Sequence, residues 1–576
     1  MRQILRAVPL VAVTALVLAG FAGAANPDTL VNVGSPRSPF AQNKQNEPAL
    51  AVDANHPNVL VAGANDEIDI EACNAGDPTT CPFTPGIGTS GVYFSFDSGT
   101  TWTQPTYTGL TARDCLGPAA CTPHVGPIGT LPRYFENGLV SDGDPAVAFG
   151  PAPGVGGFDW ANGSRLYYAN LSSGLPGGGL KGFEAIAVSR TDNPQAAAAN
   201  DKGAWQPPVV VSKQSSATFA DKEQIWADNA SSSTFFGNVY VCWENFVGNG
   251  AGALVVARST DGGDTWSQKQ VTPAHAVPPK LWGQSGCTIR TDSEGNVYVF
   301  YEQFQSPFTF LPPHGTHMLV KSFDGGVSWT RPLSLYGITD PCFRFSNDGA
   351  GDRCVEDGLA GARNDLSASP SVSIANGAPT GAGATNEIVN AWADGRDGLN
   401  HEHVLFSSSS GGGDPGTWSV PRAIETSGDR GYYAAPAISP DGSTVYVVYN
   451  AFTTPFRDDT SSPRGLVGVV KRASVSGDGT VGSFADVHRG VPGDPRGSSQ
   501  NNLVMEFLGD YVYAVATDTY GAAVWNDVRD AADCPAIDAY RQSFQTGGSL
   551  PAPAVQSACP ATFGNSDIRG GSYLTP

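Results

Sequence analysis

Short apolar runs separated by Gly, Pro, Asn and Asp recur along the whole chain and set the first expectation about the fold. The runs are rich in Val, Ile, Tyr and Ala and are bounded by turn residues, which is typical of β-strands. No long amphipathic helix is evident from the spacing of apolar residues. The pattern therefore predicts an all-β protein.

The runs come in pairs, and the pairing repeats along the chain. The first strands of the pairs are expected at 48–53, 145–149, 224–228, 287–292, 370–374, 436–439 and 509–515. The second strands are expected at 58–62, 165–169, 237–243, 295–301, 387–392, 443–449 and 521–525. Each unit then offers a third and an outer strand, as in a propeller blade. We predict a β-propeller of seven four-stranded blades, with six blades as the alternative if the second or seventh unit is misread.

The two ends of the repeat region suggest how the ring closes. The seventh unit has a third strand expected at 536–544 and little after it, whereas Thr29–Gly34 is a spare strand before the first unit. We expect Thr29–Gly34 to supply the outer strand of the last blade, because closure removes two exposed sheet edges.

The first 25 residues have the form of a secretory signal peptide. Arg2 and Arg6 precede an apolar run over 7–23, which ends in the small residues Ala22-Gly23-Ala24. A membrane anchor is the alternative, but the run is near the lower length limit for a span. We expect a secreted, extracellular protein with one propeller domain over 26–576, and no membrane span in the mature chain.

Ten cysteines in an exported chain predict up to five disulfides. Sequence proximity favours the pairs Cys73–Cys81, Cys115–Cys121, Cys342–Cys354 and Cys534–Cys559. Cys242 and Cys287 then remain and would join neighbouring blades. Spacing alone leaves the connectivity open, and zinc binding is disfavoured because no C-x-x-C pair occurs.

The formal net charge is −21, and no block rich in Lys or Arg occurs. Such a surface suits a soluble exported protein and argues against a nucleic-acid partner.

One short motif recurs with the pattern S-x-D-x-G-x-[ST]-W. It occurs at Ser95–Trp102, Ser259–Trp266 and Ser322–Trp329, with looser copies at Ser410–Trp418 around Asp414 and Ser189–Trp205 around Asp192. The Asp should accept backbone N–H groups of a tight turn, and the Trp should pack back over the turn. We therefore assign a structural role to Asp97, Trp102, Asp261, Trp266, Asp324 and Trp329.

These motifs resemble the Asp boxes of the sialidase superfamily, also called BNR-repeat proteins. The resemblance covers about residues 47–544 and implies the propeller fold; it is less specific for activity, because members include glycosidases, sorting receptors and assembly factors. A sialidase is expected to grip a substrate carboxylate with three arginines and to use a Tyr nucleophile. This chain departs from that pattern, since Arg37 is the only arginine between the signal peptide and the first box.

Polar residues precede the inner strands and should line the mouth of the central channel. They are Glu47, Asp142, Asp144, Asp221, Lys222, Glu223, Asn364, Asp365, Asp429, Arg430, Asp510 and Tyr511. A solvated rim is the simpler interpretation of such a ring. If the rim is catalytic, the candidates are Arg430, Tyr432, Glu223, Asp144, Arg290 and Arg363.

No cofactor is expected. The segments 66–71 and 456–459 carry oxygen ligands suited to calcium, but neither has an EF-hand spacing. Two functions remain open. The favoured one is a monomeric propeller that binds glycans or surface proteins outside the cell, and the alternative is an exo-acting, sialidase-type glycoside hydrolase that cleaves terminal acidic sugars.

Overall fold

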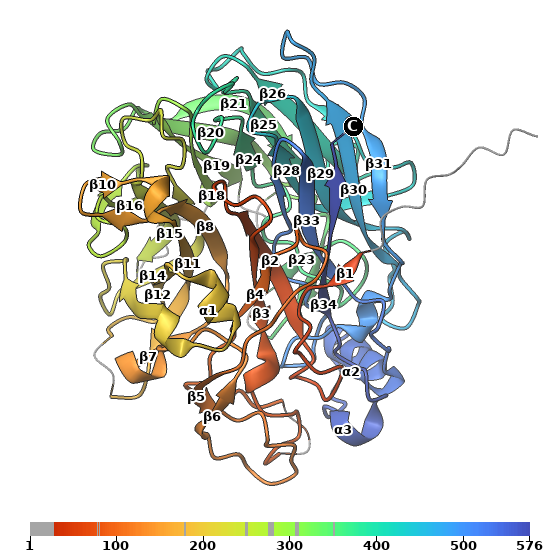
Figure 1. Cartoon of the computed structure of the whole chain (residues 1–576). Helices are drawn as coiled ribbons and strands as arrows, with labels where there is room; N and C mark the ends of the chain where they lie inside the picture. Colours follow the sequence, from red (N-terminus) through yellow and green to blue (C-terminus); the bar gives the residue numbers. More distant parts are fainter. Residues whose placement is uncertain are drawn as a thin grey trace, which may run out of the picture.

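The computed structural model describes residues 28–575 except 78, 80, 178–179, 248–251, 275–281, 306–309 and 350–351. Seven antiparallel sheets stand around a central channel as the blades of a propeller (Figure 1). The prediction of seven blades is confirmed, and the six-blade alternative is wrong. The expected signal peptide over 1–25 lies outside the described residues.

The strands of each blade follow one another from the channel outward. The first three blades are built from β2 (Gln45–Val52), β3 (Leu60–Asp66) and β4 (Ser90–Ser95); β8 (Ala146–Pro151), β11 (Ser164–Gly174), β12 (Ala185–Thr191) and β13 (Trp205–Val210); and β14 (Thr218–Ala227), β15 (Val239–Val247), β16 (Gly252–Ser259) and β17 (Ser267–Gln270). The next three are built from β18 (Trp282–Thr291), β19 (Val297–Gln305), β20 (His314–Ser322) and β21 (Leu333–Thr339); β24 (Ser371–Ile374), β25 (Ile388–Asp394), β26 (His403–Ser409) and β27 (Arg422–Ala423); and β28 (Arg430–Ile438), β29 (Thr444–Phe452), β30 (Leu466–Ser474) and β31 (Ala485–Arg489).

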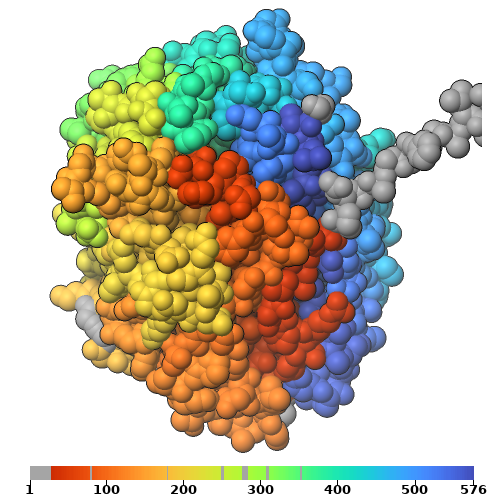
Figure 2. Space-filling view, in the orientation of Figure 1, coloured from red at the N-terminus to blue at the C-terminus, as the bar shows by residue number. Residues whose placement is uncertain are grey.

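The seventh blade joins the two ends of the chain. It consists of β32 (Tyr513–Ala516), β33 (Tyr520–Asp527), β34 (Asp567–Leu574) and the N-terminal β1 (Thr29–Leu30). Because β1 pairs with β34, the prediction that Thr29–Gly34 closes the ring is confirmed. In the space-filling view, red N-terminal residues accordingly lie beside blue C-terminal ones (Figure 2).

The third strand of the seventh blade was placed wrongly by the sequence pattern. The segment expected as a strand over 536–544 is the helix α2 (Pro535–Gln545), and the strand is β34. Ile537 and Arg541 of α2 are buried, which is the spacing of one helix face. Pro535 at the first helical position also favours a helix start.

The remaining elements belong to connections and insertions. They are β5 (Tyr107–Thr111), β6 (His124–Ile128), β7 (Leu139–Ser141), β9 (Pro153–Gly154), β10 (Gly157–Phe158), β22 (Arg344–Asn347), β23 (Asp352–Val355), the short helices α1 (Pro194–Ala198) and α3 (Val555–Ala558), and the 3-10 helices η1 (Glu67–Asp69), η2 (Phe135–Asn137), η3 (Trp160–Asn162), η4 (Lys202–Ala204) and η5 (Pro495–Gly497). The first blade lacks a full fourth strand, and only a bridge from Phe94 to Thr103 takes its place.

Most of the apolar core is divided among the seven interfaces between blades, and two further clusters lie under the insertions of the rim side. Between the first two blades, for example, Val61 and Phe94 pack with Phe149 and Trp205. Between the last blade and the first, Leu60 and Tyr93 pack with residues of β33 and with Val31. Each blade therefore buries its two faces against its neighbours, as expected for a closed ring of sheets.

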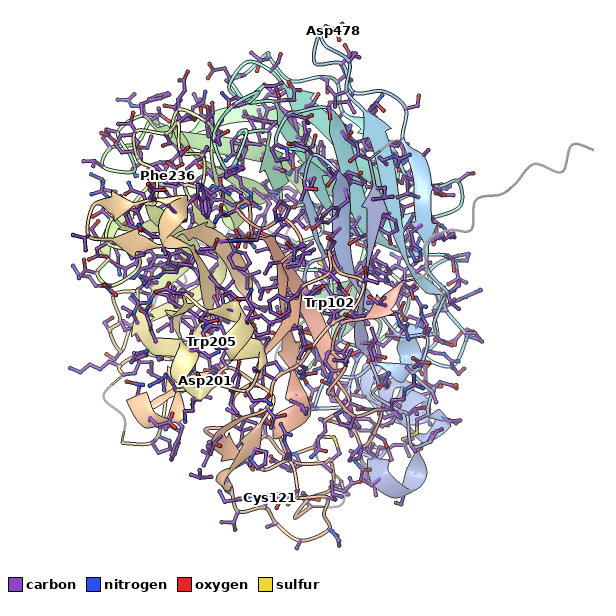
Figure 3. The ribbon with its side chains drawn as sticks, in the orientation of Figure 1. Trp102, Cys121, Asp201, Trp205, Phe236 and Asp478 are labelled. Carbon is purple, nitrogen blue, oxygen red and sulfur yellow. A yellow bond between two sulfur atoms is a disulfide. The ribbon has the colours of Figure 1, made fainter. Side chains whose placement is uncertain are left out.

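The two ends of the channel differ. We call the end where the inner strands begin the rim face and the end where the third strands end the box face, because the Asp-box turns follow the third strands. Cys121 of the 109–137 insertion and Asp478 of the β30–β31 turn lie at opposite ends of the molecule (Figure 3). The long insertions at 66–91, 109–137 and 336–364 leave and rejoin the blades on the rim face.

Five disulfides are present, and all five predicted pairs are confirmed. Cys242–Cys287 connects β15 to β18 and so joins the third blade to the fourth. Five disulfides fit an oxidising, extracellular setting. No helix within the described part of the chain is long and apolar enough to span a membrane.

Candidate functional site

The inner strands of the first three blades are distorted near their starts and present charged side chains at the rim face. The register of the inner strands shifts at Glu47 in β2 and at Lys222 in β14. Glu47 and Lys222 have φ values of 56° and 59°, and Asp144, just before β8, has 50°. Left-handed backbone is uncommon for residues other than glycine, and such conformations cluster at functional sites. Three neighbouring blades thus hold an ionisable residue in the same costly conformation.

The strands of the third and sixth blades begin earlier than the sequence predicts. β14 starts at Thr218 and β28 at Arg430, instead of 224 and 436. Lys222 and Glu223 therefore lie at a bulge within β14, and not in a loop before that strand. Polar residues at the bulge conceal the strand from an apolar pattern.

Asp510, from the segment before β32, is the centre of an ion-paired group at the channel mouth. Its Oδ2 lies 2.6 Å from Lys222 Nζ and 3.2 Å from Arg363 Nη2. Lys222 Nζ also lies 3.7 Å from Asp144 Oδ2, and Arg363 Nε lies 3.4 Å from Asp365 Oδ2. We call Glu47, Asp144, Lys222, Glu223, Arg363, Asp510 and Tyr511 the rim cluster.

Close packing of the seventh blade on the first holds Glu47 in place. Gly509 has φ 78°, and a Cβ there would lie 2.3 Å from Glu47 Cγ. Any larger residue would therefore push the blades apart. Glu47 Oε2 accepts a hydrogen bond of 2.7 Å from Asn65, whose Oδ1 accepts one of 2.7 Å from the backbone N–H of Asp144.

The carboxyl groups of the rim cluster differ in protonation. Burial raises the pKa of Glu223 well above its usual value, and the charge of Asp144 adds to the effect. Burial also raises the pKa of Glu47, helped by the charges of Asp144 and Asp510. For Asp510, burial is outweighed by the charges of Arg363 and Lys222, which hold its pKa well below the usual range. Burial therefore favours the protonated forms of Glu47 and Glu223, whereas the two neighbouring cations favour the ionised form of Asp510.

A small cavity of about 60 Å³ lies beneath the mouth, and Lys222, Glu223, Asp510 and Tyr511 line it. Both carboxyl oxygens of Glu223 and Oδ1 of Asp510 are buried and have no hydrogen-bond partner among the described residues. Buried polar atoms are nearly always hydrogen-bonded in folded proteins, so orphans of this kind indicate a bound water or ligand group. The volume suits a few water molecules or one polar group of a ligand, but not a whole sugar ring.

The arginines proposed for a substrate grip do not gather at one point. Arg430 donates four hydrogen bonds to protein oxygens, two of them to Glu402 at 2.7 and 2.9 Å. Arg290 lies deeper in the channel and contacts Tyr513. Among the described residues, Arg290, Arg363 and Arg430 share no hydrogen-bond or ion-pair partner. This placement gives no support to a three-arginine grip.

Tyr432 is placed as a packing residue and not as a nucleophile. Its hydroxyl donates to the backbone carbonyl of Arg363, and Tyr433 donates to the same oxygen at 3.2 Å. Burial raises the pKa of both tyrosines well above the usual value. Tyr432 therefore supports the loop that carries Arg363.

The three Asp boxes form the same turn on the box face. Asp261 Oδ1 accepts from the backbone N–H of Thr265 at 2.9 Å and from the hydroxyl of Ser259 at 2.7 Å. Asp97 and Asp324 make the equivalent bonds within their turns. Each Trp packs at the interface with the preceding blade: Trp102 lies between the last blade and the first, and the partly buried Trp266 and Trp329 lie between the second and third and between the third and fourth blades.

The looser fifth-blade copy is shifted by one residue from the predicted alignment. The turn starts at Ser409, whose Oγ accepts from the backbone N–H of Gly413, so that Gly411 takes the place of the box Asp. Asp414 instead forms a 2.5 Å ion pair with Lys321 of the fourth blade. A glycine at the Asp position hides the box from the motif pattern.

Carboxylates of both segments considered for calcium are engaged in internal contacts, Asp459 of the second accepting from Ser461 and Ser462. Asp69 accepts from Arg113, Thr130 and the backbone N–H of Gly129. Within the described ranges, no group of three or more His, Cys, Asp or Glu side chains is arranged to hold a metal ion.

Two contributors to the site were missed in the sequence. Phe507 lies under the Arg363 guanidinium, with 4.4 Å between its ring centroid and Cζ, and Lys44 approaches the same ring at 4.4 Å. Asn65 at the rim end of β3 connects Glu47 to Asp144. Asn65 comes shortly after the second strand predicted over 58–62, so its place near the rim face could have been inferred from the sequence. No local sequence pattern indicates Phe507.

No protein-family model matches the sequence, and a search of curated proteins finds no significant match. Solved structures with a similar fold include a Hadza microbial sialidase, Hz136 (12% identity, TM-score 0.38, covering 70% of this chain and 63% of that one). They also include the intramolecular trans-sialidase from Ruminococcus gnavus (11%, 0.39, 73% and 94%) and the α-L-arabinofuranosidase Arb93A from Fusarium graminearum (9%, 0.37, 74% and 92%). This chain thus spans less than two thirds of the Hadza sialidase. At these identities the similarity is one of fold.

Proposed function

We propose that the protein binds the hydroxyl-bearing end of a neutral glycan at the rim cluster, outside the cell. The observation that carries this proposal is the set of buried, unpartnered carboxyl oxygens on Glu223 and Asp510 at the channel mouth. A ligand hydroxyl can donate a hydrogen bond to Asp510 Oδ1 and accept one from the protonated carboxyl group of Glu223, which would give both groups a partner.

The charge balance of the rim cluster favours a neutral sugar over an acidic one. Lys222 and Arg363 share Asp510, and each has a further carboxylate within 4 Å. Neither cation is therefore left for a ligand carboxylate, whereas acidic sugars are usually held by a free guanidinium fork. The ligand would rest on the mouth and insert a single polar group into the cavity of about 60 Å³.

Hydrolysis of the bound glycan is a second candidate function, favoured by one further observation. Glu223 and Asp510 line the same cavity, and their surroundings push their pKa values in opposite directions. Pairs of this kind mark acid and base roles in many enzymes, and glycosidases use one protonated and one ionised carboxyl group. In this scheme Glu223 gives its proton to the glycosidic oxygen as the C–O bond breaks, a water molecule adds to the anomeric carbon, and Asp510 accepts the proton released by that water.

Binding should be measured first on an array of neutral and acidic glycans, and then by titration calorimetry on the best ligand. We expect neutral glycans to bind and Asp510→Asn to weaken binding at least tenfold, because the variant loses the charge that orders Lys222 and Arg363. Asp264→Asn is the matched control, since Asp264 is exposed on the box face and pairs with Arg190. Absence of any glycan ligand for folded protein, or equal binding by both variants, would rule the proposal out.

Glu223→Gln separates binding from hydrolysis. Because burial raises the pKa of Glu223 and so favours its neutral form, glutamine is close to it in shape and charge, and the fold and glycan affinity should change little. If the protein is a hydrolase, turnover of the bound glycan should fall by about 10²-fold or more, as expected when a general acid is removed. Unchanged turnover in this variant would exclude Glu223 as the acid.

A further inference from the structure

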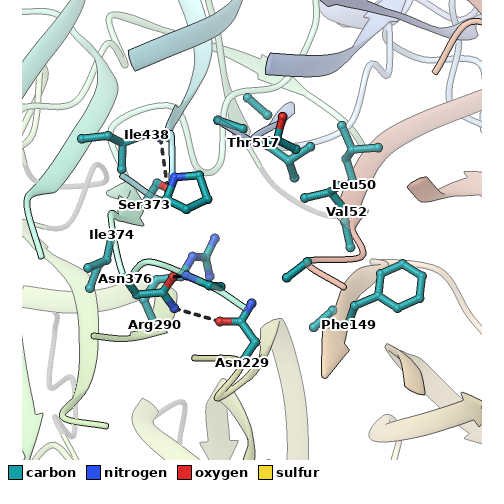
Figure 4. Close-up of a pocket in the computed structure, with 18 of the residues that line it drawn as sticks. Leu50, Val52, Phe149, Asn229, Arg290, Ser373, Ile374, Asn376, Ile438 and Thr517 are labelled. Atoms are coloured by element: carbon teal, nitrogen blue, oxygen red, sulfur yellow. Dashed lines mark hydrogen bonds between the residues drawn. The ribbon is translucent and has the colours of Figure 1, made fainter. Parts of the chain in front are cut away.

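A second, larger cavity lies in the channel on the box-face side of the rim cavity (Figure 4). Its volume is about 280 Å³, and inner strands of the blades form its wall. Arg290 on β18 and Tyr513 on β32 line both cavities, so they form the partition between them. The partition is held by a hydrogen bond of 3.2 Å from Arg290 Nη2 to Tyr513, whose hydroxyl donates to Gln224 at 2.5 Å. We call this larger space the channel chamber.

Arg290 is a buried cation without a matching anion. Arg290 is only 7% exposed. It nevertheless forms no ion pair with a carboxylate in the described part of the chain. Two of its five N–H groups donate, to the Ile289 carbonyl and to Tyr513. Its guanidinium carbon also lies 4.8 Å from the centre of the Trp226 ring. A cation–π contact offsets part of the cost of burying a charge, but buried charges are normally paired as well.

The walls of the channel chamber combine a group of polar side chains with apolar ones, and Ile374 lies beside the polar group (Figure 4). Arg290, Asn229 and Asn376 lie together, and Leu50 and Val52 face them across the space (Figure 4). Small-molecule sites usually combine apolar walls with a few polar groups in volumes from about 300 Å³ upward. The channel chamber is near this lower limit, which restricts a ligand to one ring or a short chain.

The polar side of the channel chamber is fixed in place by a loop of the fifth blade. Asn376 donates to Asn229 of the third blade at 2.8 Å. The carbonyl of Pro379 accepts from Trp160 of the second blade at 3.1 Å and from the backbone N–H of Ser231 at 2.9 Å. These bonds join three blades beneath the channel chamber, so its shape does not depend on a ligand being present.

We propose that the channel chamber is a binding site for a small monocarboxylic acid with an apolar body. The free N–H groups of Arg290 bind the carboxylate, because a guanidinium fork matches a carboxylate in a bidentate way. The apolar body of the ligand packs against Leu50, Val52 and Phe149. This site is separate from the rim cluster and does not depend on glycan binding.

The test compares two acids, phenylacetate and hexanoate, with their uncharged amides by titration calorimetry and saturation-transfer NMR on the mature protein. We expect both acids to bind and both amides to bind at least tenfold more weakly. Arg290→Met should remove the preference for the acid, and Val52→Phe, which fills the apolar side, should weaken the acids at least tenfold while leaving Arg290 in place.

Arg344→Met is the matched control, because Arg344 is exposed on the hairpin β22–β23. This variant should bind the acids as tightly as the wild type. Near-UV circular dichroism establishes that each variant is folded. If Arg290→Met does not fold, the comparison of acid with amide and the Val52→Phe variant decide the question. No binding of either acid to wild type, equal binding of acids and amides, or wild-type binding by both Arg290→Met and Val52→Phe would overturn the proposal.

Discussion

At the scale of single residues, several buried carboxyl groups have a raised pKa, which favours their protonated form. Burial raises the pKa of Glu244 to about 8 and that of Glu184 to about 9, in addition to Glu47 and Glu223. Burial of a carboxylate is costly unless it is paired, so the folded state keeps the proton instead. Stability must then depend on pH.

A fall in stability toward alkaline pH is the first consequence. The pKa of Glu244 is higher in the folded than in the unfolded chain. Its contribution to the free energy of unfolding is therefore complete below about pH 4.5 and is lost as the pH rises to about 8. We expect the free energy of unfolding of the wild type to fall between pH 5 and pH 8, and that of the Glu244→Gln variant to fall by a smaller amount. Urea denaturation at each pH unit measures this. The exposed Glu294→Gln should follow the wild type, and the same slope in Glu244→Gln would contradict the assignment.

At the scale of elements, the turns on the box face and the bulges on the rim face perform different tasks. An Asp box satisfies its turn within a few residues, so its residues can be recognised from the sequence alone. The bulges at Glu47 and Lys222 instead place backbone in left-handed conformations that only the surrounding blades can hold. Structural turns and candidate functional positions therefore lie at opposite ends of the blades, the turns after third strands and the bulges in inner strands.

Loss of one box should lower stability without affecting the rim. Asp261→Ala removes the acceptor for the N–H groups of Asp264 and Thr265, and we expect it to cost about 1–2 kcal/mol, as for other capping carboxylates. The midpoint of urea unfolding measures the cost. Asp458→Ala, at an exposed position, is the matched control and should remain within about 0.5 kcal/mol of wild type. A loss of glycan binding by folded Asp261→Ala would contradict the structural role.

At the scale of the whole molecule, stability depends on contacts between blades and on closure of the ring. Asp28, just before β1, pairs with Arg529 and Arg569 of the last blade and so reinforces the closing strand. The Cys242–Cys287 disulfide joins two other blades across a separation of 45 residues. Cys115–Cys121, in contrast, closes a loop of the 109–137 insertion with a separation of 6.

The two disulfides should differ in their contribution to stability. The entropy of loop closure in the unfolded chain predicts a loss of about 4 kcal/mol for Cys242→Ala/Cys287→Ala and about 2 kcal/mol for Cys115→Ala/Cys121→Ala. Urea unfolding of the two double variants provides the comparison. An equal or smaller loss for the pair between blades would show that native contacts, and not chain entropy, dominate.

The sequence by itself predicted the propeller, favoured seven blades over six, and indicated the closing strand and the five disulfide pairs, because strand periodicity, turn chemistry and cysteine spacing are largely local signals. It left the cysteine connectivity open until the structure confirmed it. It also located the polar ring that includes Glu223, Asp144 and Asp510. Only the tertiary structure decided that α2 is a helix outside the blade sheet, and that Arg430 is tied to Glu402. The pairing of Asp510 with Lys222 and Arg363 spans three distant parts of the chain. That Arg290 forms no ion pair within the described residues likewise depends on the blades around the channel. Such contacts arise from ring closure, which brings together residues whose sequence neighbours carry no sign of one another.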